Sequence, residues 1–227
     1  LYEFDRGVWF CHTLFTYGGK MATKENKKNF IRQYIIDSAR IYSSELAGKS
    51  FLYVYGEDFF EVSFPINHFL HLTGVETNLS AKEFYRNAKK GHLTNRQFYF
   101  NGRHPYANAK KKLPCLKRLP ELTNEVVCIL KDMETLTVTY KLSLTNLEFT
   151  LGLVKDMSEF GNKNNYFLPM SLRVKDSAVE KSKEGDIVDF IFAKEASHMK
   201  YDLILVSDEN KKIPNTVKHL LGAELIK

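Results

Sequence analysis

Hydrophobic side chains recur at helical spacing over residues 23–46, the first long pattern in the chain. Phe30, Ile35 and Leu46 belong to this series, which would form one apolar stripe along a helix. Gly48 follows directly, and a glycine just after the last apolar position is a typical helix stop. The pattern therefore predicts a helix over these residues.

Three shorter elements are expected next. Residues 51–64 contain two runs of aromatic and β-branched side chains around Gly-Glu-Asp, which predicts a β-hairpin. Pro65 can open a short helix over 66–72, because the first helical position needs no backbone N–H donor. Ser80 followed by Glu83 is a capping-box signature, in which each side chain bonds the backbone N–H of the other. A second helix is therefore expected to begin there.

After Pro120 the sequence pattern changes from mainly helix-like to mainly strand-like. Residues 106–119 have helical character, although Pro114 would interrupt a helix. Strand-like runs separated by turn-forming residues then follow at 126–130, 136–142, 147–154, 166–174, 186–194 and 201–206, with a closing helix at 214–221. Helices first and strands second, without βαβ alternation, predict an α+β fold: N-terminal helices followed by an antiparallel β-sheet.

The same order predicts a single α+β domain over residues 21–227. Its helical and basic part covers about 21–120, and its sheet part covers about 121–207. A length of 227 residues also allows two smaller domains, joined near the lysine-rich stretch in the middle of the chain. Residues 1–20 precede Met21 and stay unassigned, as an upstream extension, a remnant of the expression vector or an authentic first element.

The composition excludes several classes of protein. With 44% hydrophobic and 26% charged residues, the chain is typical of a folded protein and not of a disordered one. No stretch approaches the ~20 apolar residues that span a bilayer, so we expect no membrane-spanning segment. Three cysteines without a Cys-x-x-Cys pair predict a reducing compartment and no disulfide framework.

The positive charge is concentrated in one segment. The formal net charge is +6, but residues 82–118 hold eleven basic residues and one acid, Glu83, which gives +10 there and −4 elsewhere. Aromatic side chains lie between these charges, and cations with aromatic faces are what single-stranded nucleic acid requires. The alternative is a solvated basic face whose aromatic residues point into the core. The cations expected to bind RNA are Arg86, Lys89, Lys90, Arg96, Arg103, Lys110, Lys111 and Lys112.

Most sequence motifs of known chemistry are missing. The chain has no phosphate-binding glycine loop and no G-x-S-x-G nucleophile elbow. His68 and His71 could reach one ion, but no second ligand cluster accompanies them, so neither a metal nor a cofactor is expected. Glu209 and Lys211 match the Glu-x-Lys of metal-dependent restriction-type nucleases, but they fall in a turn-like stretch. The alternative of a metal-dependent nuclease would require magnesium.

His71 is the first catalytic candidate. It lies on the expected short helix, just before the Thr73-Gly74 corner. Histidine is the usual proton carrier near neutral pH, because its unperturbed pKa lies close to that pH. The alternative is a histidine that only satisfies the local backbone.

The segment NHFLHLTGV at 67–75, with the following helix that contains Phe-Tyr, resembles phage-associated nucleases of the barnase–EndoU–colicin–RelE class, polyvalent-protein and prophage type. A Lys-x-x-x-Leu segment starting at Lys112, a block at 166–174 and a late strand at 189–194 are similar to segments of the same families. The resemblance covers roughly 50–207 and leaves residues 1–20 outside.

This resemblance implies a metal-independent endoribonuclease in which a base activates the ribose 2′-OH, an acid protonates the departing 5′-oxygen and cations stabilise the phosphoryl group. By matched position, His71 is the expected acid or base, and Arg173 and Lys194 the phosphoryl clamp. Ser171 would orient a phosphate oxygen, and Tyr85 would supply a proton or stack on a base. Arg173 and Lys194 could instead be ordinary solvent-facing strand residues.

The resemblance also implies a biological setting. Such a nuclease would be a toxin or phage-conflict effector in the bacterial cytoplasm, encoded by the bacterium or a phage. RNA would be its substrate, and an antitoxin or immunity protein would be a further partner. The rival hypothesis is a non-catalytic module that binds nucleic acid or a partner through residues 82–118. The sequence sets neither the target RNA nor the oligomeric state.

Overall fold

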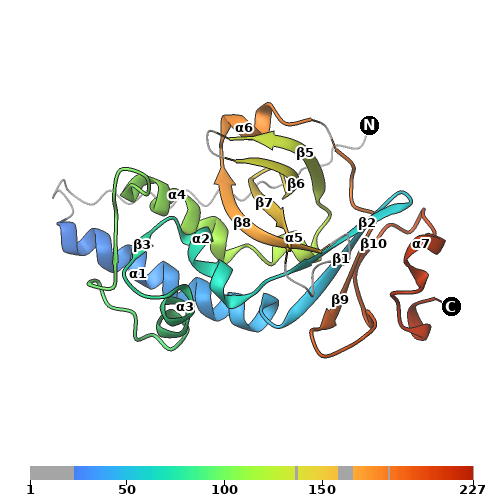
Figure 1. Cartoon of the computed structure of the whole chain (residues 1–227), viewed down its shortest axis with the longest axis horizontal. Coiled ribbons are helices and arrows are strands. Elements are labelled where there is room, and N and C mark those ends of the chain that lie inside the picture. The colour runs from blue at the N-terminus through green and yellow to red at the C-terminus, as the bar shows by residue number, and fades with distance from the viewer. Residues whose placement is uncertain (1–22, 136–137, 158–165, 184, 227) are drawn as a thin grey trace, which may run out of the picture.

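The structure is a computed structural model, and it describes residues 23–135, 138–157, 166–183 and 185–226 (Figure 1). Residues 1–20, which the sequence analysis left unassigned, lie outside the described residues. The longer helices are α1 (Lys24–Ile41), α2 (Phe69–Thr73), α3 (Ala81–Lys89) and α4 (Tyr106–Lys117), and the shorter ones are α5 (Glu121–Asn124), α6 (Ser177–Glu180) and α7 (Asn215–Lys218). Helical turns η1 (Tyr42–Leu46), η2 (Ile66–His68) and η3 (Ala223–Leu225) extend or precede them.

The expected helices of the first part are present, with the caps that the sequence indicates. Thr23 accepts a hydrogen bond from the N–H of Asn26 at the start of α1, and Ser80 and Glu83 form the reciprocal capping box of α3. Helix α4 runs through Pro114, contrary to the expected break. Pro114 is exposed while the opposite face of α4, including Leu113, is buried, so packing outweighs the one missing backbone hydrogen bond.

One curled sheet contains eight of the ten described strands (Figure 1). These strands are β1 (Lys49–Tyr55), β2 (Asp58–Ser63), β5 (Cys128–Glu134), β6 (Thr139–Thr145), β7 (Phe149–Lys155), β8 (Tyr166–Val174), β9 (Phe190–Glu195) and β10 (Leu203–Ser207). Their order is β10-β9-β1-β2-β8-β7-β6-β5. All neighbours are antiparallel except β2 and β8. The α+β fold with a mostly antiparallel sheet is therefore confirmed.

The expected strand at 186–194 begins later, at Phe190 of β9. The residues before it lie along the free edge of β5 instead: Ile129 donates its N–H to the carbonyl of Asp186 at 2.8 Å, and Val188 donates to the carbonyl of Val127 at 2.9 Å. The chain then enters β9 beside β1. This segment therefore connects β5 back to the other half of the curled sheet.

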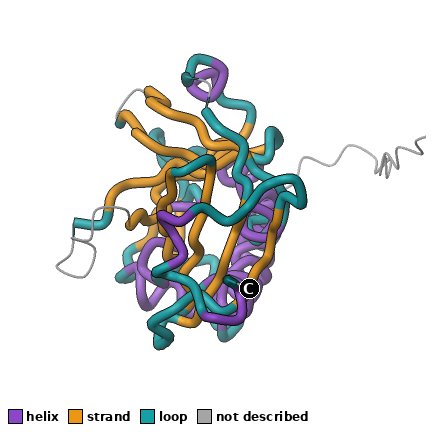
Figure 2. The backbone as a smooth tube through the Cα atoms, turned by 90° about the vertical axis from the view of Figure 1, so that its right-hand side faces the viewer, coloured by secondary structure: helices purple, strands orange, loops and turns teal. Residues whose placement is uncertain are grey.

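Strand β1 is buried on both faces, because side chains alternate along a strand. Phe51 and Tyr53 face a large core that α1, α3, α4 and the sheet share. Leu52 and Val54 face a smaller core to which the C-terminal segment contributes residues such as Val217. Figure 2 shows this segment lying across the strands. Within the described part of the chain, no helix has the length and apolar character needed to cross a membrane.

A small second sheet links the helical part to the cleft described below. Strand β3 (Glu76–Thr77) pairs antiparallel with β4 (Phe98–Tyr99), so Glu76 lies opposite Tyr99. Helix α3 is inserted between these strands in the sequence. The pairing brings the residues after Tyr99 back to the C-terminal end of α2.

Candidate active-site cleft

A cleft with a volume of about 1400 Å³ lies where α2, α4, β8 and α6 meet. These helices and β8 are adjacent in Figure 1, and α2 contacts both α4 and β8. We call it the basic cleft. Its polar lining includes His71, His104, Lys111, Lys112, Ser171 and Arg173. A concave site with convergent polar groups is the usual form of an active site.

Helix α2 presents His71 to the basic cleft. Phe69 and Leu72 are buried on the other side of this short helix, whereas His71 is exposed. Desolvation lowers the pKa of His71 below its usual value, the positive charge of His68 lowers it further, and the carboxylate of Glu76 opposes these effects. His71 is therefore mostly neutral at physiological pH, the form that accepts a proton.

His68 is held away from the cleft lining. Its Nδ1 donates a hydrogen bond to the carbonyl oxygen of Pro169 at 2.8 Å, which ties α2 to β8. The ring centroids of His68 and His71 are 5.8 Å apart. His68 thus positions the helix that carries His71.

Lys112 of α4 is a partly buried cation in the basic cleft. Desolvation lowers its pKa to about 8, Arg173 contributes in the same direction, and Asp176 opposes the shift. The exposed neighbour Lys111 donates from Nζ to the carbonyl of Lys175 at 3.1 Å. From the sequence, Lys112 was expected only to bind RNA. Its environment in the cleft brings its pKa closer to neutral pH, as is common for functional groups in active sites.

Ser171 and Arg173 lie two residues apart on β8 and therefore share one face of the strand. Nη1 of Arg173 donates to Oδ2 of Asp176 at 3.0 Å, and Oδ1 of Asp176 accepts from the N–H of Ala178 to cap α6. Ser171 is only 8% exposed and lines the cleft. The guanidinium is thus oriented by a fixed carboxylate rather than swinging freely in solvent.

The sequence interpretation missed Glu76 and Asp176, and it counted His104 only as part of the basic segment. Nδ1 of His104 lies 2.7 Å from Oε1 of Glu76 at the edge of the cleft. The segment after β4 returns to Glu76 through strand pairing, which no local pattern indicates. The available signal for Glu76 was its position two residues after Gly74.

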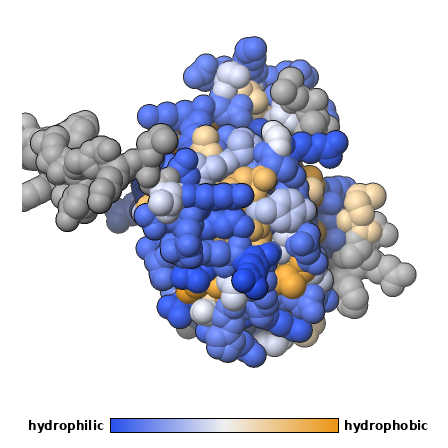
Figure 3. All heavy atoms as spheres, turned by 90° about the vertical axis from the view of Figure 1, so that its left-hand side faces the viewer, coloured by the Kyte–Doolittle hydropathy of each residue, from blue (hydrophilic) through white to orange (hydrophobic). Residues whose placement is uncertain are grey.

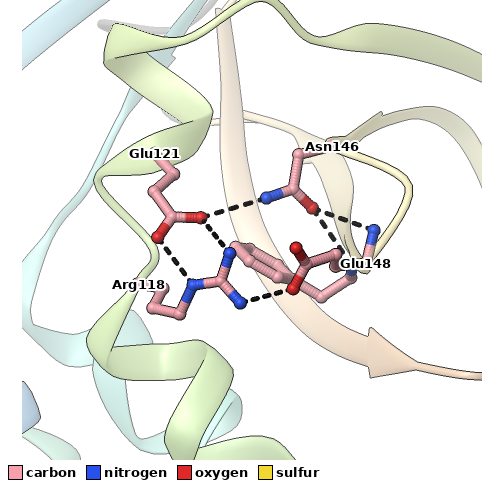
Figure 4. A network of polar contacts seen from close by, with 5 residues as sticks. Arg118, Glu121, Asn146 and Glu148 are labelled. Carbon is pink, nitrogen blue, oxygen red and sulfur yellow. Dashed lines mark hydrogen bonds and ion pairs between the residues drawn. The ribbon is translucent and has the colours of Figure 1, made fainter. Parts of the chain in front are cut away.

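A polar network fixes the C-terminal end of α4, the helix that carries Lys112 (Figure 4). Arg118 bonds Glu121 through Nε at 2.6 Å and Nη2 at 2.8 Å, and its Nη1 pairs with Glu148. Nδ2 of Asn146 donates to Glu121 at 3.2 Å. The network joins α4 and α5 to the turn between β6 and β7.

Two expected site residues lie elsewhere. Tyr85 is 3% exposed and packs edge-on against Tyr42 and Phe69 in the large core. Lys194 is on β9, which β1 and β2 separate from β8. Its Nζ lies 4.7 Å from the centre of the Tyr201 ring and donates to the carbonyl of Met199. Neither residue lines the basic cleft.

The eight expected RNA-binding cations divide into two groups. Arg103, Lys111 and Lys112 line the basic cleft. The others are exposed but lie outside its lining: Arg86, Lys89, Lys90, Arg96 and Lys110. The end of the molecule that includes α3 is predominantly hydrophilic (Figure 3). The basic segment thus contributes both to the cleft and to the surface outside it.

Among the described residues, no group of three or more His, Cys, Asp or Glu side chains is placed to hold a metal ion. Three carboxylates line the cleft: Glu76 lies against His104, Asp176 is paired with Arg173, and Glu134 is the third. Lys211 of the Glu-x-Lys match bonds the buried Asp189 at 2.6 Å and does not line the cleft.

Comparison with known proteins agrees with the resemblance in the sequence. Residues 34–212 match the family model described as "phage-Barnase-EndoU-ColicinE5/D-RelE like nuclease4". The match covers well over half of the chain and includes the segments that form the basic cleft. No curated protein and no solved structure gives a significant match. The chain therefore belongs to this phage-associated family of barnase–EndoU–colicin–RelE-like nucleases.

Proposed function

We propose that the protein is an endoribonuclease that cleaves RNA by attack of the ribose 2′-OH on the adjacent phosphate, without a metal ion. The observation that carries this proposal is the convergence of His71, Lys112 and Arg173 in one cleft of a nuclease-family chain. These groups supply a proton acceptor and two cations. They are the functions that an intramolecular phosphoryl transfer requires.

His71 acts as the general base. Its lowered pKa keeps the imidazole neutral at physiological pH, so it can take the proton from the 2′-OH. The 2′-oxygen then bonds to phosphorus while the bond from phosphorus to the 5′-oxygen breaks. The products are a 2′,3′-cyclic phosphate and a strand with a 5′-OH, once that oxygen has received a proton.

Lys112 and Arg173 offset the negative charge that builds on the phosphoryl oxygens. Both are partly buried, and charge interactions are stronger where water is excluded. With a pKa of about 8, Lys112 is mostly protonated at pH 7. Ser171 lies on the same face of β8 as Arg173 and would orient one phosphate oxygen.

The donor set of the cleft supports a metal-independent reaction. It combines imidazole, ammonium and guanidinium groups with three carboxylates, of which Glu76 and Asp176 are paired with cations. Among the described residues no three carboxylates and histidines are grouped as a magnesium or other metal site would require. A reaction that begins at the 2′-OH also requires RNA, because deoxyribose lacks that nucleophile. We further propose that the enzyme acts in the cytoplasm as a toxin or phage-conflict effector, with an antitoxin or immunity protein as its inhibitor.

The test is incubation of the purified protein with labelled RNA in EDTA. We expect cleavage that leaves 2′,3′-cyclic ends, no cleavage of DNA of the same sequence, and no cleavage after His71→Ala. His92→Ala is the matched control, because His92 is exposed and outside the cleft lining. Absence of RNA cleavage under all conditions would overturn the proposal, and a strict magnesium requirement would overturn its metal independence.

The alternative function is nucleic-acid binding without catalysis, favoured by the five expected cations outside the cleft. That protein would bind RNA or DNA with an affinity that falls steeply with salt. It would show no turnover, and His71→Ala would leave binding unchanged. The cleavage assay with the same variant therefore separates the two functions.

A further inference from the structure

We infer that His104 is the general acid that protonates the departing 5′-oxygen, and that Glu76 is the residue that positions it. This inference rests on the proposed ribonuclease function and assigns its missing proton donor. Neither residue was a catalytic candidate from the sequence. Both line the basic cleft together with His71.

The contact between Glu76 and His104 determines which ring nitrogen is available. Nδ1 of His104 is buried and lies 2.7 Å from Oε1 of Glu76, although the angle is not that of a good hydrogen bond. Two lone pairs repel at this distance, so Nδ1 must carry a hydrogen. The side chain of His104 as a whole is 40% exposed. Nε2 is therefore the nitrogen left to exchange a proton with a substrate.

The backbone around His104 is fixed independently of Glu76. Oδ1 of Asn101 accepts hydrogen bonds from the N–H groups of Arg103 and His104, at 3.0 and 2.7 Å. The N–H of Asn101 donates to the carbonyl of His104 at 3.1 Å. This closed turn leads through Pro105 into α4. The imidazole is thus held from both its backbone and its ring, as a preorganised catalytic group requires.

His71 and His104 have complementary environments in the same cleft. Desolvation disfavours a proton on His71, and a positive charge on His104 contributes to this effect. The Glu76 carboxylate contacts Nδ1 of His104 and so orients its ring, as the carboxylate of a catalytic triad orients its imidazole. His71 is therefore suited to accept a proton, and the oriented ring of His104 presents Nε2 to donate one.

The proton balance of the reaction closes with this pair. His71 takes the proton from the 2′-OH as the bond between the 2′-oxygen and phosphorus forms. His104 gives its Nε2 proton to the 5′-oxygen as the bond from phosphorus to that oxygen breaks. The cleft ends with His71 protonated and His104 neutral, and no external oxidant, reductant or metal is needed.

The test compares an ordinary RNA with one in which sulfur replaces the bridging 5′-oxygen at a single site. Thiolate leaves without a proton, so only steps that need the acid are bypassed. We expect His104→Asn to slow cleavage of the oxygen substrate about 10²–10⁴-fold, the usual contribution of a general acid. The sulfur substrate should be cleaved at close to the wild-type rate. His71→Ala should be slow on both.

Glu76→Gln should also slow cleavage of the oxygen substrate, by a smaller factor, and leave cleavage of the sulfur substrate near the wild-type rate. Glu76→Asp, which keeps the carboxylate, should recover part of the rate on the oxygen substrate. Glu125→Gln is the matched control and should cleave both substrates normally, because Glu125 is an exposed carboxylate outside the cleft lining. Urea unfolding of each variant checks that the fold is kept.

The outcomes are distinguishable. If the wild-type protein cleaves RNA but His104→Asn is fully active, or is equally slow on both substrates, the acid assignment is overturned and the proposed function stands. The assignment is also overturned if Lys112→Met, and not His104→Asn, is rescued by sulfur. If the wild-type protein cleaves neither substrate, the proposed function itself fails.

Discussion

Gly74 faces the side chain of Lys112 at the wall of the basic cleft: a Cβ added to Gly74 would lie 3.2 Å from Cδ of Lys112. The same Cβ would be 3.5 Å from Cα of Ala109. Gly74 also ends α2 with a φ of 73°, a conformation that glycine adopts without steric cost. The glycine therefore serves both the turn after His71 and the placement of the α4 lysine.

Gly74→Ala is expected to reduce both stability and activity. The left-handed backbone alone should cost about 1 kcal/mol, because alanine disfavours positive φ. The added methyl group should also displace Lys112 or α4 and lower the rate of RNA cleavage about tenfold or more. Urea unfolding and the cleavage rate of the folded variant measure the two effects separately.

Gly48→Ala is the matched control for this prediction. Gly48 has a φ of 84°, but a Cβ there would meet nothing within 4 Å. It should lose similar stability while retaining the wild-type cleavage rate. Equal activity loss in both variants would show that backbone strain, and not the contact with Lys112, is responsible.

The rate of RNA cleavage should have a bell-shaped pH dependence. At acidic pH the rate should fall as His71 becomes protonated, with a midpoint lower than for an ordinary histidine because desolvation lowers its pKa. At alkaline pH it should fall as the general acid loses its proton and as Lys112, whose pKa is about 8, loses its charge. Lys112→Arg retains the charge and should make the alkaline decline shallower. An acid limb centred above pH 6.5 would contradict the role of His71 as base.

Lys112→Met should stabilise the protein while it impairs cleavage. Because the pKa of Lys112 is lowered from 10.5 to about 8, its protonated form is less stable in the folded state than in the unfolded chain. This loss of folding stability is complete below about pH 8, where Lys112 is protonated in both states. It disappears as the pH rises through 10.5, where the lysine is neutral in the folded state and loses its proton in the unfolded chain as well. Removing the charge at pH 7 should therefore add on the order of 1–3 kcal/mol to the free energy of unfolding.

Urea unfolding at pH 7 and at pH 10.5 tests the stability change. The advantage of Lys112→Met should shrink at the higher pH, where the wild-type lysine is neutral in the folded state. Lys111→Met is the matched control, because Lys111 is exposed and should show little change at either pH. A destabilised Lys112→Met variant would contradict the burial argument.

Local sequence patterns predicted the helices well but could not supply the order of the strands. The capping box of α3 and the apolar spacing of α1 are short-range signals, and both elements form as expected. Strands β2 and β8 are far apart in the sequence, yet they pair in parallel between Glu61 and Tyr166. Such long-range pairing depends on shared burial and leaves no periodic trace in either segment.

The sequence likewise indicated some of the residues that line the basic cleft and not others. His71, Ser171 and Arg173 converge, because the matched family segments carry them to α2 and β8. Lys194 does not, because two strands of about 4.8 Å spacing intervene between β9 and β8 and place it well away from the cleft. Tyr85 lies on the apolar face of α3, and helical spacing alone could not separate a buried tyrosine from a functional one.

A buried hydrogen bond away from the cleft should contribute to stability and not to catalysis. The hydroxyl of Tyr201 donates to Oε2 of Glu61 at 2.6 Å, and both side chains are buried. Burial and the neighbouring carboxylate raise the pKa of Tyr201, so it remains a donor at all working pH values. Tyr201→Phe leaves Glu61 without this donor and should cost about 1.5–3 kcal/mol.

Urea unfolding measures that cost, with Tyr99→Phe as the control because Tyr99 is 38% exposed. The folded Tyr201→Phe protein should cleave RNA at the wild-type rate, since neither Tyr201 nor Glu61 lines the basic cleft. A selective loss of cleavage would indicate that this network reaches the site.

The exposed cations outside the cleft should affect RNA affinity rather than the chemical step. Lys89 and Lys90 lie at the C-terminal end of α3 and are exposed. If each contacts one phosphate, the combined change of both to Gln should weaken binding and reduce the slope of log affinity against log salt by about 1.4, at about 0.7 per single-strand contact. The cleavage rate at saturating RNA should remain unchanged. The paired change of Lys155 and Lys212 to Gln, two exposed lysines outside the expected RNA-binding set, should leave the slope as it is. An unchanged slope after the Lys89 and Lys90 substitutions would show that the RNA contacts are confined to the cleft.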